Sequence, residues 1–311
     1  MKISRFFDSL SIKAGVLAML ALGGCIATTY PYMRTETAQR IAAPAWMIKR
    51  DISADPFILR AYERIHDRGG YANIYIEGES TAAGSATPFN PVALHLASKD
   101  DAENVIYIAR PCQYTGMLTV TADCSTDYNA ASSFSDGVID SYNIALDDIA
   151  NRYNIHTFNL IGYSGGAAIA SLLASQRKDV VSLRTVAGIL DHDAYTTLSG
   201  IPPFSESRNP VNEASTLTKM PQYHFIGGRD GVVPPTVLHS FLQSMPPTNC
   251  VQTMLIQEAE HDVGWVDKWP ELLELSVNCN NSDTAFAPET LMPPTMPQDL
   301  PRTVREKPVK P

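Results

Sequence analysis

The residues around Ser164 carry the clearest chemical pattern in this sequence. Apolar residues lead into Gly-x-Ser-x-Gly, which spans Gly162 to Gly166, and small residues that favour a helix follow. A serine on a sharp turn between a strand and a helix exposes its hydroxyl above the sheet, and larger neighbours would clash there. The helix N-terminus and the backbone N–H of Gly165 would face a developing oxyanion. The pattern predicts that Ser164 is a nucleophile, although the same letters also occur in plain tight turns.

A serine hydroxyl is a weak nucleophile at neutral pH, so this chemistry needs a base and a residue that orients the base. His261 follows an expected strand at 251–256, and Asp230 lies between an expected strand at 222–226 and a helix. We interpret His261 as general base and then acid, and Asp230 as the carboxylate that fixes its tautomer. Asp230 precedes a glycine and could instead be a turn residue. His192, which follows a strand end, is the alternative base.

Asp191 is the alternative to Asp230, because it also follows a strand end. Asp230 belongs to a short glycine-rich turn that leads into a helix, which can hold a carboxylate rigidly. Asp191 begins a long loop, with His192 and Asp193 beside it. We therefore expect Asp191 to shape a pocket or organise a lid.

These side chains require a scaffold that brings the ends of separate strands together. Short apolar runs alternate with helical patterns, which is typical of βα units around a mainly parallel sheet. An antiparallel hairpin is expected first, from the segments 46–52 and 57–64. Later strands are expected at 72–77, 104–109, 157–161, 183–187, 222–226 and 251–256, and helices at 91–98, 134–153, 166–176, 235–245 and 270–277. The stretch 191–220 is rich in Ser, Pro and Asn and is interpreted as a lid or substrate loop.

The order Ser164, Asp230, His261 resembles the α/β-hydrolase superfamily of serine hydrolases, whose triad runs serine, acid, histidine along the chain. The resemblance covers roughly residues 46–277. It implies an α/β-hydrolase fold with a mainly parallel sheet of about eight strands, helices on both faces and a lid-like loop insertion. The chain also resembles bacterial exported hydrolase-like lipoproteins, in Tyr-Ile-Glu-Gly at 75–78, Ala-Arg-Pro-Cys-Gln-Tyr at 109–114 and Leu-Asp-His at 190–192. This second resemblance supports the same triad and indicates no substrate.

A second oxyanion donor is expected in the loop after the strand at 72–77. Many superfamily members end this strand in His-Gly, whereas this chain continues as Glu77-Gly78-Glu79-Ser80. Backbone N–H groups perform this function, so Glu79 or Ser80 can donate whatever its side chain. A carboxylate beside an oxyanion is unfavourable unless it points away, and we expect Glu77 to organise the loop as a hydrogen-bond acceptor.

The N-terminus predicts export. Three basic residues precede an apolar run at 14–24, whose 11 residues suit a signal peptide and are too short to cross a bilayer. Leu22-Gly23-Gly24-Cys25 resembles the lipobox of bacterial lipoproteins, in which the peptide is cut before the cysteine and the cysteine is acylated. Gly23 is a less usual choice there. Ile26 directly follows this cysteine, and in this position the chain resembles lipoproteins that are sent to the outer membrane and face the periplasm. An ordinary signal peptide, or a buried helix with an incidental cysteine, remains an alternative.

Four other cysteines are an even number in an exported chain, which favours disulfides. No Cys-x-x-Cys spacing or neighbouring histidine cluster indicates a metal site. We favour Cys112 with Cys124, and Cys250 with Cys279. Four cysteines allow three pairings, and free buried thiols are the other possibility.

Composition limits the function classes. The 311 residues are 44% hydrophobic and 18% charged, enough for one sizeable core. A formal net charge of -9 would repel a phosphate backbone, so nucleic-acid binding is not expected. The expected organisation is a lipoprotein signal peptide (1–24), a tether (25–45), one α/β domain (46–280) and a proline-rich disordered tail (281–311).

Together these patterns favour an esterase- or lipase-like serine hydrolase, anchored to the bacterial envelope through Cys25. It would cleave an ester, thioester or amide of a small-molecule, lipid or peptide acyl substrate through an acyl-enzyme. Two alternatives stay open, a non-catalytic binding or scaffolding lipoprotein with this fold and an acyltransferase with the same triad. No metal or organic cofactor is implied, and the oligomeric state is not indicated.

Overall fold

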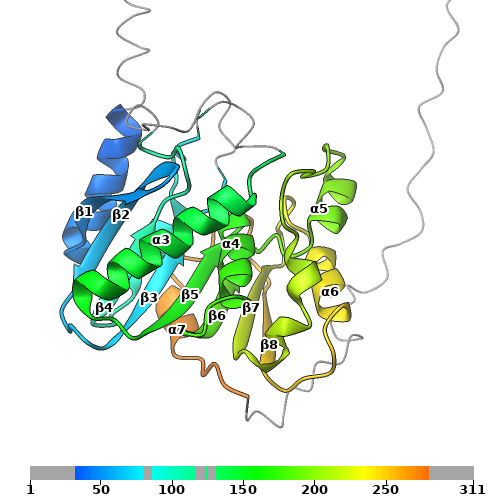
Figure 1. Cartoon of the computed structure of the whole chain (residues 1–311). Coiled ribbons are helices and arrows are strands. Elements are labelled where there is room, and N and C mark those ends of the chain that lie inside the picture. Colours follow the sequence, from blue (N-terminus) through cyan, green and yellow to red (C-terminus); the bar gives the residue numbers. More distant parts are fainter. Residues whose placement is uncertain (1–31, 80–85, 116–123, 125–130, 280–311) are drawn as a thin grey trace, which may run out of the picture.

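The computed structural model describes residues 32–79, 86–115, 124 and 131–279. The expected signal peptide, Cys25 and the expected tail lie outside these residues. Within them, one eight-stranded sheet has the order β1-β2-β4-β3-β5-β6-β7-β8 (Figure 1). The strands are β1 (Ile48–Ala54), β2 (Phe57–Ile65), β3 (Tyr71–Ile76), β4 (Asn104–Ile108), β5 (Thr157–Tyr163), β6 (Val180–Val186), β7 (Gln222–Gly227) and β8 (Val251–Ile256). The expected opening hairpin is confirmed, since β1 and β2 pair antiparallel.

β2 also pairs antiparallel with β4, and every later neighbour pair is parallel. Parallel strands end at a common edge of the sheet, so the loops after β3, β5, β6, β7 and β8 gather there. β3 and β5 run side by side from Tyr71 opposite Thr157 to Ile76 opposite Gly162. This register places the loop that begins at Glu77 beside the turn that carries Ser164.

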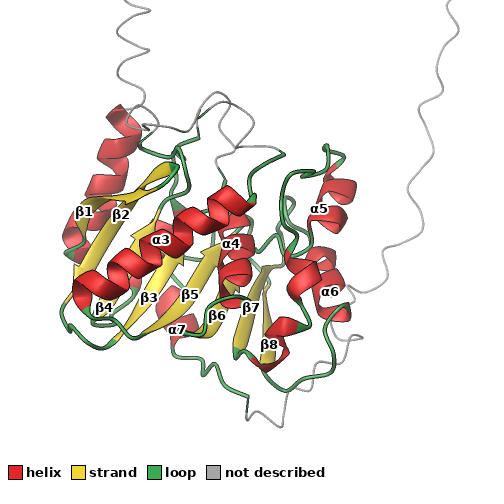
Figure 2. Cartoon of the chain, in the orientation of Figure 1, coloured by secondary structure: helices red, strands yellow, loops and turns green. Residues whose placement is uncertain are grey.

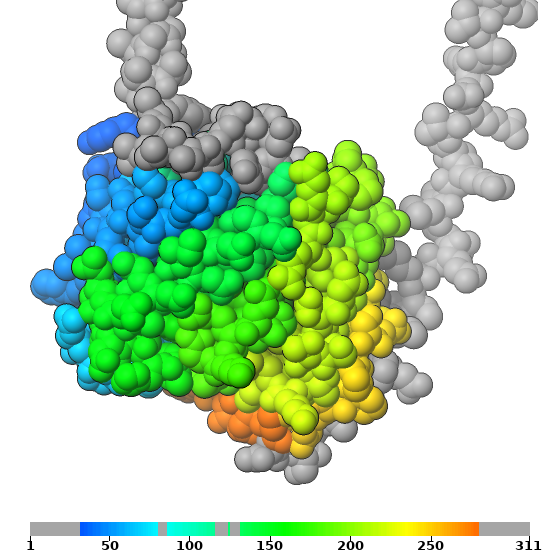
Figure 3. All heavy atoms as spheres, viewed as in Figure 1, coloured from blue at the N-terminus to red at the C-terminus, as the bar shows by residue number. Residues whose placement is uncertain are grey.

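Helices cover both faces of the sheet. They are an α-helix over 32–42, α2 (Val92–Lys99), α3 (Asp136–Tyr153), α4 (Gly165–Ala174), α5 (His192–Ser199), α6 (Pro235–Gln243) and α7 (Trp269–Leu273). One apolar core includes side chains of α3, α4 and α6, and a second includes those of 32–42, α2 and α7. Figure 2 shows α3 and α4 across one face. In the space-filling view their atoms cover the strands beneath (Figure 3).

The strands join these two cores because their side chains alternate between the faces. In β3, Ile74 and Ile76 belong to the core beneath α3 and α4, and Tyr75 belongs to the core beneath α2 and α7. All three are completely buried. Burial on both faces explains why the central strands read as nearly continuous apolar runs.

The N-terminal boundary of the domain differs from the expected one. The segment 32–42, assigned to an irregular tether, forms a helix that packs against the sheet. Ala38 and Ala42 are fully buried, and Ile41 packs against the same core. Their spacing places them on one face of a helix. In this short segment that stripe of small residues was too weak a signal to indicate packing.

The lid-like stretch 191–220 is more regular than its composition indicated. It contains α5 and two short 3-10 helices, Pro210–Glu213 and Thr216–Lys219. Asp191 precedes α5 as its N-cap, and its side chain accepts the N–H groups of Asp193 and Ala194. The last expected helix is also shorter than predicted, because α7 ends at Leu273.

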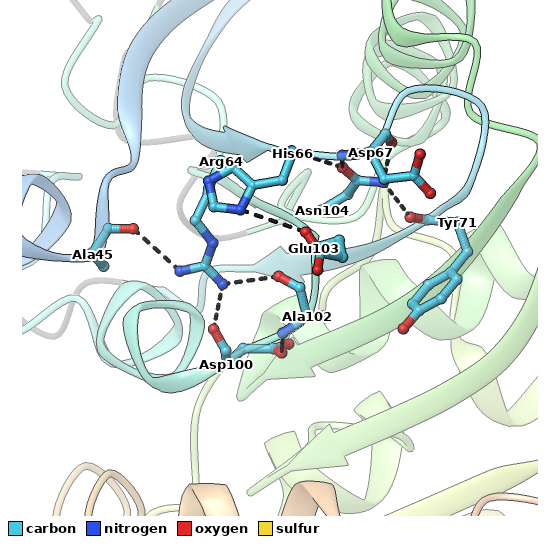
Figure 4. A network of polar contacts seen from close by, with 9 residues as sticks. All are labelled: Ala45, Arg64, His66, Asp67, Tyr71, Asp100, Ala102, Glu103 and Asn104. Atoms are coloured by element: carbon cyan, nitrogen blue, oxygen red, sulfur yellow. Dashed lines mark hydrogen bonds and ion pairs between the residues drawn. The ribbon is translucent and has the colours of Figure 1, made fainter.

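A polar network fixes the sheet at the edge opposite Ser164 (Figure 4). Arg64, from the end of β2, donates to the backbone carbonyls of Ala45, Asp100 and Ala102. Asn104, at the start of β4, bonds backbone groups in the loop that leads into β3. These contacts give buried backbone groups hydrogen-bond partners where the strands begin. The candidate site lies at the opposite edge of the sheet.

Both favoured disulfides are present. Cys112 is joined to Cys124, and Cys250 to Cys279, with Cα atoms 5.5 and 3.9 Å apart. Closing a loop the size of the first should stabilise the fold by roughly 3 kcal/mol in the chain-entropy model. None of the helices in the described part of the chain has the length and hydropathy of a membrane-spanning segment.

The pairing gives a testable expectation. Peptide mapping of the purified protein under non-reducing conditions should recover Cys112 linked to Cys124, and Cys250 linked to Cys279. A Cys112→Ala, Cys124→Ala double variant should lose roughly 3 kcal/mol of unfolding free energy, measured with denaturant. A peptide joining Cys112 to Cys250 or Cys279 would contradict the pairing.

Candidate active site

Ser164 occupies a sharp turn between β5 and α4. Its backbone has φ 52° and ψ -122°, a conformation that costs a non-glycine residue of order 1–3 kcal/mol. Glycine is required on both sides of this turn. A Cβ at Gly162 would lie 2.4 Å from the Ala167 Cα, and one at Gly166 would lie 2.2 Å from the Ile76 carbonyl oxygen. The strain and the close packing are what a nucleophile elbow requires.

The structure brings Ser164, His261 and Asp230 together from three strand ends. His261 Nε2 lies 3.0 Å from Ser164 Oγ, and His261 Nδ1 lies 2.9 Å from Asp230 Oδ2. All three residues are buried, with exposed fractions of 4, 9 and 8% for Ser164, His261 and Asp230. A carboxylate can only accept, so Nδ1 carries the proton and Nε2 is free to accept the serine proton.

Backbone contacts fix the two supporting side chains. The second carboxylate oxygen of Asp230 accepts the N–H groups of Val232 and Val233, both at 2.8 Å. Trp265 is fully buried, and its indole N–H is 2.9 Å from the carbonyl oxygens of both Glu260 and His261. Trp265 therefore pins the loop that carries the imidazole. The sequence analysis did not identify Trp265; the available signal was a large aromatic residue four positions after the histidine.

The two residues expected to donate to the oxyanion, Gly165 and Glu79, lie close together, with one difference from expectation. The side chain of Glu79 was expected not to matter, but its carboxylate fills the space that Gly165 leaves open. A Cβ at Gly165 would lie 1.9 Å from Glu79 Oε2. The carboxylate forms a 3.0 Å ion pair with Arg110, which is buried. The acidic group tolerates this position because the guanidinium offsets its charge.

Glu77 organises the loop as expected. Its completely buried carboxylate accepts the N–H of Gly78 at 3.0 Å and that of Ala93 at 3.3 Å. Burial raises the pKa of Glu77 to about 7, and the hydrogen bonds from these backbone groups oppose the shift. The Gly78 N–H is therefore engaged, and Glu79 is the next residue whose N–H can face the oxyanion.

The alternative acid and base lie elsewhere. Asp191 caps α5, and its other oxygen accepts the hydroxyl of Ser240. His192 is buried between aromatic rings, 4.3 Å from the Phe134 centroid and 5.2 Å from that of Phe204. Within the described part of the chain, neither ring nitrogen of His192 has a hydrogen-bond partner. Burial lowers its pKa to about 3, and the charge of Arg110 contributes. The imidazole that meets Ser164 is that of His261.

The buried imidazole of His192 predicts acid sensitivity. Its pKa in the folded state is about 3, below the ordinary value of 6.5. Between these pH values the unfolded chain binds more protons, so stability is complete above pH 6.5 and falls as the pH is lowered. The slope contributed by one histidine reaches about 1.4 kcal/mol per pH unit. Urea unfolding at pH 7 and pH 4.5 should show a smaller decline for His192→Leu than for the wild type. Equal declines would contradict this assignment.

Among the described residues, no group of three or more His, Cys, Asp or Glu side chains is placed to hold a metal ion. The arrangement instead suits proton transfer from a serine hydroxyl to an imidazole, beside backbone N–H groups at the start of a helix.

The fold of the chain is similar to that of solved structures. The chain is similar to an esterase from Pyrococcus furiosus, with 15% identity and a TM-score of 0.51 over 73% of this chain and 90% of the other. It is similar to an α/β serine hydrolase homologue from Coxiella burnetii, with 16% identity and a TM-score of 0.52 over 73% and 94%. A membrane phospholipase A, described as a bacterial virulence factor, has 12% identity and a TM-score of 0.52 over 87% and 97%. No family model and no curated protein sequence matches the chain.

Proposed function

We propose that this chain, whose fold is that of the α/β hydrolases, is a serine hydrolase that cleaves an ester, thioester or amide through an acyl-enzyme. One observation carries the proposal. A continuous hydrogen-bonded line runs from Asp230 through His261 to a serine held on a strained turn at the start of a helix. A fold kept only for binding has no need of all three groups in this geometry.

The geometry supports an acyl transfer in two halves. In the first, His261 Nε2 takes the proton of Ser164 as the hydroxyl oxygen attacks the carbonyl carbon, and the imidazolium returns the proton to the leaving group. Asp230 holds the imidazole and stabilises its charge. The N–H groups of Gly165 and Glu79 would donate hydrogen bonds to the oxyanion. In the second half, water repeats the attack on the acyl-enzyme and releases the acid.

Phosphonate labelling tests this proposal against the two alternatives. An activated fluorophosphonate should form a covalent adduct on Ser164 of the purified protein. A panel of esters of increasing chain length, thioesters and peptides should then show turnover. Turnover that needs an added alcohol or amine acceptor would indicate an acyltransferase. Absence of both labelling and turnover would favour the non-catalytic binding lipoprotein.

Anchoring through Cys25 is a separate part of the proposal, and the position of the N-terminal helix supports it. Arg34, in the first turn of this helix, bonds the carbonyl of Thr87 and lies over the ring of Phe89. Asn90 then donates to the carbonyl of Asp262, beside His261. The chain between Cys25 and the helix can span at most about 25 Å. A lipid on Cys25 would therefore hold the triad edge close to an envelope membrane.

Fractionation tests the anchor. The wild-type protein should sediment with membranes, and mass spectrometry should find an acylated Cys25 at its N-terminus. Cys25→Ala should abolish the lipid and the cleavage at this position while leaving phosphonate labelling of Ser164 intact, because the domain begins beyond it. An unmodified Cys25 in the exported protein would remove the anchor from the proposal.

A further inference from the structure

The loop 77–79 lies in direct contact with the nucleophile. A Cβ on Gly78 would be 2.9 Å from the Ser164 Cβ and 3.0 Å from the ring of Tyr163, so the loop backbone fits against the serine with no spare room. Oxyanion stabilisation depends on donor positions within a few tenths of an ångström. Whatever fixes this loop therefore also fixes the catalytic geometry.

Gln113 provides one fixation from outside the loop. Its amide nitrogen donates to the Gly78 carbonyl oxygen at 2.9 Å, and its amide oxygen accepts the N–H of Arg110 at 3.1 Å. The side chain is only 1% exposed. Both ends of one planar amide are thus engaged, and they couple the loop rigidly to the segment 110–113.

Arg110 provides the second fixation from the same segment. Its guanidinium pairs with the Glu79 carboxylate at 3.0 Å, donates to the Ser133 carbonyl at 2.6 Å and lies over the ring of Phe134. Arg110 is 5% exposed, so this pair is poorly screened by solvent. Gly78 and Glu79, which follow Glu77, are therefore both held in place by side chains of the segment 110–113.

The backbone of this segment is strained. Cys112 has φ 67° and Tyr114 has φ 63°, left-handed values that cost a non-glycine residue roughly 1–2 kcal/mol each. Cys112 lies between Arg110 and Gln113 and is bonded to Cys124. Without this bond the strained backbone has fewer restraints, and relaxation would move both side chains that hold the loop.

We infer that Gln113 is a positioning residue for the oxyanion loop 77–79, and that the Cys112–Cys124 disulfide maintains turnover by holding Gln113 and Arg110 in place. The inference rests on the proposed hydrolase function. Gln113 touches neither Ser164 nor His261 and acts through the backbone of Gly78. Loss of its contact should lower kcat and leave KM nearly unchanged, because the displaced donors stabilise the transition state rather than the bound substrate.

Gln113→Met is the most specific variant, because it keeps the length of the side chain and cannot donate to the Gly78 carbonyl at any pH. We expect kcat to fall about 30-fold with KM within threefold, less than the loss of a whole oxyanion donor. Gln222→Met is the matched control. Gln222 is equally buried, but it begins β7, at the edge of the sheet away from Ser164, and its amide donates to the Leu217 carbonyl. Its kcat should stay within twofold of the wild-type value.

Reduction of the disulfide is the second arm. A dithiol supplies two electrons and two protons, converts the Cys112–Cys124 bond into two thiols and becomes a cyclic disulfide. We expect reduced wild-type protein to lose about tenfold in kcat and to recover on reoxidation. A Cys112→Ser, Cys124→Ser variant should have the same low kcat and ignore the dithiol. Cys250→Ser, Cys279→Ser is the control, because this bond lies before β8, at the edge away from Ser164, and its removal should leave both kcat and dithiol sensitivity intact.

The possible outcomes distinguish a failure of the proposed hydrolase function from a failure of the roles inferred for Gln113 and the disulfide. A wild-type protein without Ser164-dependent labelling or turnover would overturn the proposed function and this inference with it. An active wild type whose kcat is unchanged in Gln113→Met, or falls equally in Gln222→Met, would overturn the role of Gln113 alone. An unchanged kcat in fully reduced, folded protein would overturn the role of the disulfide.

Discussion

Replacing Ser164 with alanine should lower kcat by about 10⁶-fold and abolish phosphonate labelling, because a triad acts as a unit around its nucleophile. Among the described residues, His261 Nε2 is the hydrogen-bond partner of the Ser164 hydroxyl, at 3.0 Å. Without the oxygen no acyl-enzyme can form. Residual hydrolysis would come only from water activated beside the remaining donors. Steady-state kinetics on the best ester of the panel measure this loss.

The fold should survive this change. Gly162 and Gly166, whose close packing shapes the turn, remain in the variant. Ser171→Ala is the matched control, because it removes a completely buried hydroxyl that bonds the Ala167 carbonyl within α4. Its kcat should remain within a few-fold of wild type. A Ser164→Ala protein that is folded and fully active would refute the mechanism.

Local patterns were sufficient to predict the sheet. Each expected strand is present, because strands buried on both faces are short apolar runs whatever their neighbours are. β5 and β6 are longer than expected, from Thr157 to Tyr163 and from Val180 to Val186, because Gly162 and Tyr163 at the end of β5, and Val180 and Ser182 at the start of β6, still pair with the adjacent strand. Pairing across the sheet is a tertiary property and leaves little trace in one strand's composition.

The helix over 32–42 and α5 were missed for a related reason. Both are short and polar on most of their surface, so few residues indicate which face packs. α5 depends on the cap that Asp191 forms and on the contact between Asp191 and Ser240, 49 residues away. A cap is visible in a sequence only when the helix after it is already recognised.

The candidate site also has one part that could be predicted from the sequence and one part that could not. Ser164, Asp230 and His261 were predictable because each follows a strand, and parallel strands end together. The structure adds Arg110, Gln113 and Trp265, which hold the loops rather than react. Their roles depend on contacts between distant segments, and no spacing rule links them to the triad.

The second large expected effect tests which carboxylate orients His261. Asp230→Asn should lower kcat by about 10⁴-fold, because an amide can present its N–H₂ to Nδ1 and favour the wrong tautomer of the imidazole. The backbone bonds from Val232 and Val233 to Oδ1 can persist in the variant, so folding should change little. The pH dependence of kcat/KM and the unfolding free energy would be measured together.

Asp191→Asn is the matched comparison, because it makes the same chemical change at the neighbouring strand end. Its side-chain oxygen would still cap α5, and the charge lost at the helix N-terminus costs roughly 0.3–1 kcal/mol of stability. Since the Asp191 side chain bonds Ser240 and the backbone of α5, and the His261 imidazole bonds Asp230, kcat should stay within a few-fold of wild type. If Asp191→Asn instead lost several orders of magnitude in kcat and Asp230→Asn did not, the orienting acid would be Asp191, with Ser164 and His261 unchanged in their roles. The 2.9 Å contact between His261 Nδ1 and Asp230 Oδ2 is the reason to expect the opposite ranking.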